Sequence, residues 1–263
     1  MRNMICAVAV RKTPALVLIL ASSAAAVGGQ EGRDGPPRKI TNSVGMTFIR
    51  IDPGSFQMDL GSRPSGSIGR VREVKLRKGF YLQTTEVTQT QWQAVMGTNR
   101  SHFKGPDLPV EMVSWNLVQE FLGKLNAREK GPPRGANIPA QTERPGYRLP
   151  AGVEWEYACR AGAQDPNDAP GSGTVWWAAN SGSKTHPVAQ SEPNAWGFYD
   201  MRGNVSEWVS DWSSSKWDPP VRVWGDGNRN DYRYVRGGSC ASRTLLTPDS
   251  HFEWLGFRCA RNL

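Results

Sequence analysis

Tryptophan, glycine and proline are the residues that most constrain how this chain can fold. The 263 residues include 11 Trp, 28 Gly and 19 Pro. Glycine and proline mark tight turns and interrupt long helices, so this mixture favours many short elements joined by turns. Hydrophobic residues make up 38% of the chain and charged residues 21%, which leaves enough apolar material for a core. We therefore predict an irregular, loop-rich globular fold.

Residues 1–26 have the pattern of a secretory signal peptide. Three basic residues accompany an apolar stretch at 14–19, and three alanines at 24–26 form a small-residue cleavage site. The alternative is a membrane anchor, but the apolar run of about a dozen residues is shorter than the ~20 needed to span a bilayer. We expect a secreted or periplasmic protein with no stable membrane anchor after cleavage.

The rest of the chain divides into a linker and one domain. Residues 27–39 are rich in glycine, proline and charge and lack apolar periodicity, which is typical of a flexible linker. From 40 to 263 no repeat or composition shift divides the chain, so a single domain is predicted. Loss of three basic residues with the signal peptide takes the net charge from +8 to about +5. No basic run occurs, so nucleic-acid binding is not expected.

Within this domain the hydrophobic pattern predicts both strands and helices. Short or alternating apolar runs next to turn residues indicate strands at 46–51, 71–76 and 80–82. Thr88 and Ser114 each precede a helical pattern and have side chains suited to an N-cap. A third helix is expected over 151–160. The three histidines, His102, His186 and His251, lack metal-binding spacing, so a zinc or iron site is not expected.

Seven segments, taken in order, resemble successive signatures of the formylglycine-generating enzyme (sulfatase-modifying factor) family. They are GMTFIRIDPGSF (45–56), TTEVTQTQWQAVMG (84–97), LPVEMVSW (108–115), YRLPAGVEWEYACRAG (147–162), PNAWGFYDMRGNVSEWVSDW (193–212), YVRGGS (234–239) and LGFRCA (255–260). The resemblance covers nearly everything from residue 41 to the C-terminus. It implies an α+β, irregular mixed fold with little regular secondary structure, related to C-type lectin-like domains.

The same resemblance implies that the family's oxidation chemistry is missing here. In the founding enzymes two cysteines bind copper and oxidise a cysteine in a CxPxR-type motif of a sulfatase to formylglycine. Those cysteines stand third and eighth after the serine of a GGS turn, where this chain has Ser242 and Thr247. Soft sulfur ligands are what Cu(I) selects, so copper is not expected. An extracytoplasmic protein or peptide such as a sulfatase is the partner that the family implies.

Three cysteines remain after removal of the signal peptide: Cys159, Cys240 and Cys259. An odd number in an oxidising compartment indicates one disulfide and one free thiol, and the sequence alone allows three pairings. The resemblance implies a Cys159–Cys259 disulfide, because both match bridged positions in the family. Cys240 is then either a small buried residue or a displaced catalytic thiol.

The resemblance also implies a calcium site in the loop DMRGNVSE (200–207). The matching ligands are Asp200, Gly203, Val205 and Glu207, of which two provide carboxylates and two provide backbone carbonyls, as calcium prefers. The alternative is that the two acidic residues cap turns or pair with Arg202 or neighbouring arginines. A second family calcium site would match Asn180 and Ser181, but the acidic loop that completes it is absent.

Two functions remain open. The first is a calcium-stabilised binding or accessory protein without the two-cysteine copper site, since a fold can be kept while its chemistry changes. The second is a formylglycine-generating oxidase with an altered site near Cys240. Tryptophans in loops could line a binding groove, although core packing is expected for at least half of them: Trp176, Trp177, Trp217 and Trp224.

Overall fold

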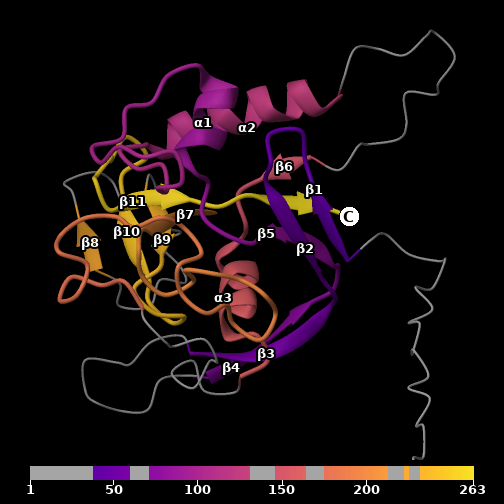
Figure 1. The fold of residues 1–263 in the computed structure, drawn as a ribbon. Coiled ribbons are helices and arrows are strands. Elements are labelled where there is room, and N and C mark those ends of the chain that lie inside the picture. Colours follow the sequence, from indigo (N-terminus) through magenta and orange to yellow (C-terminus); the bar gives the residue numbers. More distant parts are fainter. Residues whose placement is uncertain (1–37, 60–70, 131–145, 164–174, 213–221, 225–231) are drawn as a thin grey trace, which may run out of the picture. The chain divides into compact units, whose positions relative to one another are not determined.

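A computed structural model describes residues 38–59, 71–130, 146–163, 175–212, 222–224 and 232–263 (Figure 1). The predicted signal peptide at 1–26 lies outside these residues, as does nearly all of the predicted linker at 27–39. The end of that linker differs from expectation, because Lys39 already begins strand β1 (Lys39–Thr41). Among the described residues, no helix is long and apolar enough to cross a membrane.

The first five-stranded sheet brings the two ends of the domain together. Its order is β1-β2-β5-β12-β6, and every pair of neighbours is antiparallel. The strands that join β1 in it are β2 (Thr47–Ile51), β5 (Phe80–Gln83), β12 (Ala260–Asn262) and β6 (Tyr147–Arg148). The C-terminal β12 is therefore a central strand, held between β5 and β6.

The second sheet is formed by the C-terminal third of the chain and has the order β11-β7-β9-β10-β8. Its strands are β7 (Ser206–Trp212), β8 (Arg222–Trp224), β9 (Arg233–Arg236), β10 (Thr244–Leu246) and β11 (Leu255–Phe257). The β11–β7 and β10–β8 pairs are parallel, and the other two are antiparallel. A separate hairpin joins β3 (Gly54–Asp59) to β4 (Val71–Leu76).

The three predicted helices are all present. Helix α1 (Gln89–Met96) begins with a capping box between Thr88 and Gln91, which satisfies two backbone N–H groups. Helix α2 (Trp115–Lys130) starts where the Ser114 hydroxyl accepts the Leu117 N–H at 3.2 Å. Helix α3 is the third (Gly152–Arg160). In Figure 1, α1 and α2 lie together at the top, and α3 lies apart from them.

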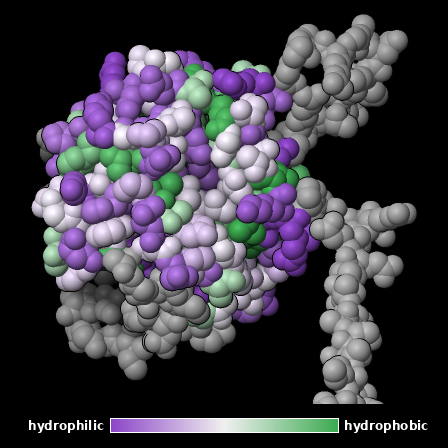
Figure 2. Space-filling model, viewed as in Figure 1, coloured by the Kyte–Doolittle hydropathy of each residue, from purple (hydrophilic) through white to green (hydrophobic). Residues whose placement is uncertain are grey.

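Two groups of buried side chains form the core. One lies under α1 and α2 and contains Trp92, Trp208 and Phe257, whereas the other surrounds Trp155 of α3. Trp155 and Trp208 are fully buried in these cores. Of the four loop tryptophans, Trp177 is 61% exposed and Trp176 is only partly buried, so neither is a core residue, whereas Trp217 and the side chain of Trp224 lie outside the described residues. The face in Figure 2 is mostly hydrophilic, with small apolar patches separated by polar residues. The fold is α+β and irregular, as predicted.

The disulfide differs from the expected pair, because Cys159 is bonded to Cys240 and Cys259 is a buried free thiol. Neighbouring residues of an extended strand face opposite sides. Ala260 faces the core around α3 together with Cys159 and Cys240, so Cys259 faces the other core, under α1 and α2. Cys159 and Cys240 have Cα atoms 5.5 Å apart, within the normal range for a disulfide.

Candidate functional site

The turn that matches the family's copper site contains hydroxyl groups instead of thiols. Ser242 Oγ lies 2.8 Å from Ser239 Oγ, and Thr247 Oγ1 lies 2.8 Å from Ser250 Oγ. Each hydroxyl is thus hydrogen-bonded to a serine of its own turn. Oxygen ligands of this kind do not provide the soft, two-sulfur site that holds Cu(I).

Cys240 is not a catalytic thiol in this structure, which corrects that hypothesis. Its sulfur is consumed by the bond to Cys159, and the residue is fully buried. Cys259 is the one free cysteine among the described residues. It is fully buried too, and burial raises the pKa of its thiol, so the reactive thiolate is disfavoured.

The loop from Asp200 to Glu207 is tightly curled and depends on its glycine. Asp200 and Asn204 have φ values of 53° and 56°, and Gly203 has a φ of 110°. A Cβ atom at Gly203 would collide with the carbonyl oxygen of Trp176, so only glycine fits there. The Asn204 N–H donates to that same carbonyl oxygen at 2.9 Å. The predicted calcium ligands between Asp200 and Glu207 therefore belong to one tight turn of the backbone.

Glu207 lies at the buried end of this loop, on strand β7. Its carboxylate accepts two hydrogen bonds from Arg258, with Nε–Oε2 at 2.8 Å and Nη2–Oε1 at 2.7 Å. Trp155 Nε1 donates a third at 2.8 Å. Glu207 and Arg258 are both fully buried. The arginine pairing that the sequence left open thus exists, but its partner is Arg258 and not Arg202.

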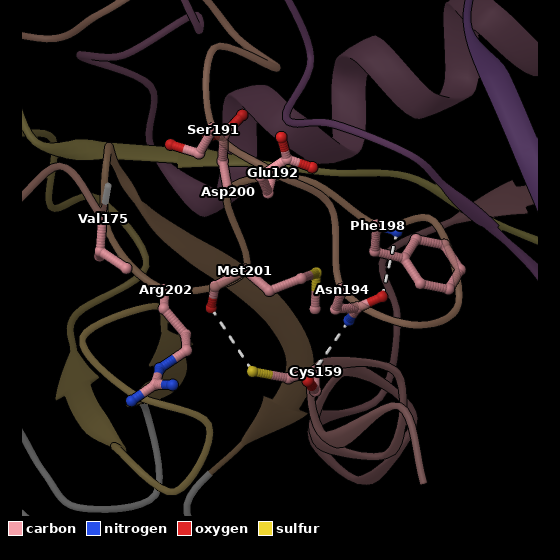
Figure 3. Close-up of a pocket in the computed structure, with 9 residues that line it drawn as sticks. All are labelled: Cys159, Val175, Ser191, Glu192, Asn194, Phe198, Asp200, Met201 and Arg202. Carbon is pink, nitrogen blue, oxygen red and sulfur yellow. Dashed lines mark hydrogen bonds between the residues drawn. The ribbon is translucent and has the colours of Figure 1, made fainter. Parts of the chain in front are cut away.

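Asp200 lies at the outer end of the loop, beside a hollow of about 20 Å³ that has room for one water molecule or one ion. Asp200 Oδ2 accepts the Ala189 N–H at 2.7 Å, and burial raises the pKa of the Asp200 carboxyl. Figure 3 shows Ser191 and Glu192 on the same side of the hollow as Asp200, whereas the Arg202 side chain points away. Oxygen atoms therefore dominate this rim.

Glu86 is the acidic residue that sequence reasoning missed. It stands in the TTEVT segment between β5 and α1, is fully buried, and has no hydrogen-bond partner for either carboxylate oxygen. Burial raises its pKa well above the usual value, and the nearby charges of Asp200 and Glu207 raise it further. An acidic residue beside the apolar Val87, in a segment of core strands, was the signal available in the sequence.

These groups form an acidic cluster, defined here as Glu86, Asp200, Glu207 and Arg258. Three carboxyl groups share one guanidinium, so the ionised cluster would carry an excess of two negative charges. Among the described residues, no three His, Cys, Asp or Glu side chains converge as a ready metal site. An ion here would need backbone carbonyls, such as those of Gly203 and Val205. Because Glu86 is buried without a partner, the residues fit a divalent cation that prefers oxygen.

The second expected calcium pair is engaged in other bonds. Asn180 Oδ1 accepts the Trp177 N–H at 2.8 Å, and the Ser181 carbonyl oxygen lies 2.9 Å from His186 Nε2. Asn180 Nδ2 also donates to the Val175 carbonyl at 2.8 Å. These bonds hold the loop in shape and leave the ligand atoms occupied.

The irregular two-sheet fold, the GGS turn and the acidic loop together define a domain of the sulfatase-modifying-factor type. Residues 36–263 match the family described as "Sulfatase-modifying factor enzyme 1-like domain", and the chain belongs to this family.

Two similar proteins differ in what their names say. "Chaperone protein LppX" of Paenibacillus barcinonensis is 33% identical, and the match covers 76% of this chain and 80% of that protein. The "Formylglycine-generating enzyme" of Mus musculus is 32% identical, with 64% of this chain and 50% of that protein covered. The match to this enzyme therefore spans only half of its length.

Solved structures support the fold. "Treponema denticola variable protein 1" superimposes with a TM-score of 0.68 at 29% identity, over 87% of this chain and all of that one. PvdO from Pseudomonas aeruginosa superimposes with a TM-score of 0.67 at 22% identity, over the same share of this chain. At that identity, PvdO supports the fold alone.

Proposed function

We propose that this protein is an exported binding or accessory member of its family that acts without the two-cysteine copper oxidase site. One observation carries the proposal. The two positions that match the copper ligands are Ser242 and Thr247, and the cysteine nearest to them, Cys240, is closed in a disulfide with Cys159. Oxidation of a substrate cysteine by copper and oxygen needs a pair of thiolates, which this turn does not provide.

Two further observations support an accessory role outside the cytoplasm. The relative from Paenibacillus barcinonensis, 33% identical over most of both chains, is named a chaperone. A buried disulfide is the kind of crosslink that persists in oxidising compartments, in agreement with the predicted signal peptide at 1–26. The partner class that follows is an exported protein, and a sulfatase is the first candidate because of the family's name.

The proposal includes one calcium ion held by the acidic cluster. Asp200 and Glu86 would provide carboxylate oxygens, and Gly203 and Val205 would provide carbonyls. Glu207, whose two oxygens already accept hydrogen bonds from Arg258 and Trp155, would take part only through a lone pair that these bonds leave unused. The ion would neutralise the excess charge and stabilise the loop between the two cores. Its role would be structural, because the site is built around a buried ion pair and not around an open substrate cleft.

The oxidase question is tested with a peptide that contains a CxPxR motif, incubated with the protein, Cu(I) and oxygen. We expect no loss of peptide thiol and no formylglycine by mass spectrometry. A copper-loaded formylglycine-generating enzyme acts as the positive control. In parallel, refolding of a denatured exported sulfatase is followed with and without the protein. Peptide oxidation at a rate near that of the control enzyme would contradict the proposal.

The double variant Ser242→Cys/Thr247→Cys sharpens this test. If the turn keeps the family geometry, the two thiols should bind Cu(I), and wild-type protein should not. The copper content of each protein, measured after gel filtration, distinguishes the double variant from the wild type. Stoichiometric copper on the wild-type protein would show that it uses a different copper site.

A further inference from the structure

A second candidate site is a pocket of about 300 Å³ whose lining includes no residue of the copper-matched turn. Four aromatic side chains line it, contributed by three separate stretches of chain: Phe103, Trp176, Trp177 and Trp254. Two of the indoles are unusually open to solvent, with Trp177 61% and Trp254 40% exposed. Small-molecule sites typically begin at ~300 Å³ and combine aromatic walls with a few polar groups. We call this the aromatic pocket.

Two of the three indoles of this pocket are stacked on neighbouring rings, and the backbone of the third is anchored. Trp176 stacks on His186 with ring centroids 3.6 Å apart, and Trp254 stacks on Phe252 at 4.8 Å. The backbone N–H of Trp177 is bonded to the Asn180 side chain. Rings that are already positioned lose little conformational entropy when a ligand stacks on them. The Trp176 and Trp254 walls of the aromatic pocket are therefore preorganised.

Two buried polar atoms that have no partner within the described part of the protein belong to residues of the pocket lining. They are Trp176 Nε1, which is a donor, and Thr185 Oγ1, which can donate or accept; both atoms are buried, and Thr185 is 6% exposed. Leaving such groups unsatisfied costs stability, typically about 1–3 kcal/mol each. A ligand that brings hydroxyl groups into the pocket would satisfy both of them once a small shift of the lining side chains uncovers these buried atoms.

The charges at the pocket restrict the ligand class. Lys184 and Glu253 line it and carry opposite charges, so their sum is zero. Aromatic platforms that bind nucleic acids combine stacking with a positively charged groove, and this pocket has none. A phosphorylated or strongly acidic ligand is therefore disfavoured. The ligand should be uncharged, present a flat apolar face and carry several hydroxyl groups.

A pyranose ring meets all three requirements, since its axial C–H bonds form apolar faces and its hydroxyl groups surround the edge. We infer that the aromatic pocket binds a neutral carbohydrate, with sugar rings stacked on Trp177 and Trp254 and hydroxyl groups bonded to Trp176 Nε1 and Thr185 Oγ1. This inference rests on the proposed binding function, because it names the ligand of such a protein. A glycan-bearing exported partner would then be recognised through its sugar.

Isothermal titration calorimetry with neutral hexasaccharides of glucose, mannose and N-acetylglucosamine tests this. At least one should bind the wild-type protein. Trp177→Ala and Trp254→Ala should each weaken that binding about tenfold or more, because buried stacking contacts of Trp dominate such interfaces. Trp212→Ala is the matched control, since Trp212 is 56% exposed on β7 but does not line this pocket. Its affinity should equal that of the wild type.

Thr185→Val separates ligand binding from a structural role. The variant keeps the shape of the side chain and removes an unsatisfied hydroxyl, so thermal stability should stay equal or rise while sugar affinity falls severalfold. Failure of every hexasaccharide to bind would overturn the inference, as would binding that all three tryptophan variants retain. Competition by a CxPxR peptide for the same tryptophans would instead identify a peptide site. The oxidase assay has a separate readout, so either proposal can fail without the other.

Discussion

This protein has two buried charge clusters with excess charges of opposite sign. They differ in whether groups of the chain form hydrogen bonds to the excess charge. The acidic cluster has three carboxyl groups and one arginine. The basic cluster is defined here as Glu156, Arg160, Arg236 and Arg243, with three guanidinium groups around one carboxylate. Glu156 Oε1 lies 2.7 Å from Arg160 Nη2, and Glu156 Oε2 lies 3.1 Å from Arg236 Nη2 and 3.2 Å from Arg243 Nη2.

Backbone carbonyl groups accept hydrogen bonds from the excess arginine of the basic cluster, whereas no backbone N–H group of the described residues donates to the excess carboxylate of the acidic cluster. Arg236 donates to the carbonyl oxygens of Gly152 at 3.0 Å and Ser242 at 3.2 Å, and only its Nε is left without a partner. Burial nevertheless lowers the pKa of Arg236 to about 10. Glu86 in the acidic cluster receives no N–H donor from the part of the chain that the structure describes, and its carboxyl group lies within hydrogen-bonding reach of the Asp200 carboxyl, with which it can share a proton. Carbonyl oxygens can surround excess arginines, but excess carboxylates need N–H groups, protons or a metal ion.

The largest expected effect comes from neutralising the centre of the basic cluster. Glu156→Gln leaves three buried guanidinium groups without their shared carboxylate, and breaking such a buried network costs about 3–5 kcal/mol. Urea unfolding should show this loss in the free energy of unfolding. The control is Glu120→Gln on the exposed face of α2, where the pair with Lys124 contributes about 0.3–0.5 kcal/mol. Equal losses in the two variants would contradict the assigned role of Glu156.

The disulfide comes next, because it lies between the two clusters. Cys159 precedes Arg160 of the basic cluster, its Sγ lies 3.6 Å from the Met201 carbonyl in the acidic loop, and Cys240 is 81 residues further on. The double variant Cys159→Ala/Cys240→Ala should lose about 2–5 kcal/mol of unfolding free energy. Thiol titration of unreduced wild-type protein should find neither cysteine reactive. If Cys159 and Cys259 were bridged instead, Cys259→Ala would cost as much as the double variant.

Calcium should raise the thermal stability of the protein through the acidic cluster alone. A cation bound at 100 times its dissociation constant stabilises the folded protein by about 2.7 kcal/mol, so chelation with EGTA should lower the thermal midpoint. Glu86→Gln should abolish that calcium response. In EGTA the same variant should be as stable as the wild type or more so, because it replaces a buried carboxyl group whose ionised form has no N–H partner among the described residues.

Glu156→Gln is the matched substitution for that experiment. It should lower stability equally with calcium and with EGTA, since the basic cluster offers no cation site. The same change of Glu to Gln thus has opposite consequences in the two clusters. A full calcium response in Glu86→Gln protein would remove Glu86 from the site.

The sequence predicted the elements better than the pairings between them. Thr88 and Ser114 are local caps, and local hydrogen bonds are visible in local sequence. The predicted disulfide was wrong because it depends on which core each residue faces, and Cys259, just before β12, faces a different core from Ala260. Glu86 was missed for the same reason. It meets Asp200 and Glu207 only after the chain has folded, across more than 100 positions of sequence.

The smallest effect concerns Glu111, a buried carboxyl group whose situation is intermediate between those of Glu207 and Glu86. Its Oε1 accepts the Phe103 N–H at 2.8 Å, whereas its Oε2 has no partner. Burial raises the pKa of the Glu111 carboxyl. A raised pKa means that the folded state holds its proton more tightly, so the stabilising contribution is complete below the ordinary Glu pKa and is lost as pH rises through the folded-state pKa.

Glu111→Gln keeps the acceptor for Phe103 and cannot ionise. The difference in unfolding free energy, variant minus wild type, should therefore increase as pH rises above the ordinary Glu pKa and then level off. Urea unfolding over a pH series in EGTA measures this difference. The pH-dependent contribution of the acidic cluster to the unfolding free energy cancels, because the cluster is present in both proteins. Glu120→Gln, at the surface, should show almost no such slope. A difference that falls with rising pH would mean that Glu111 is held as a carboxylate, in the manner of Glu207.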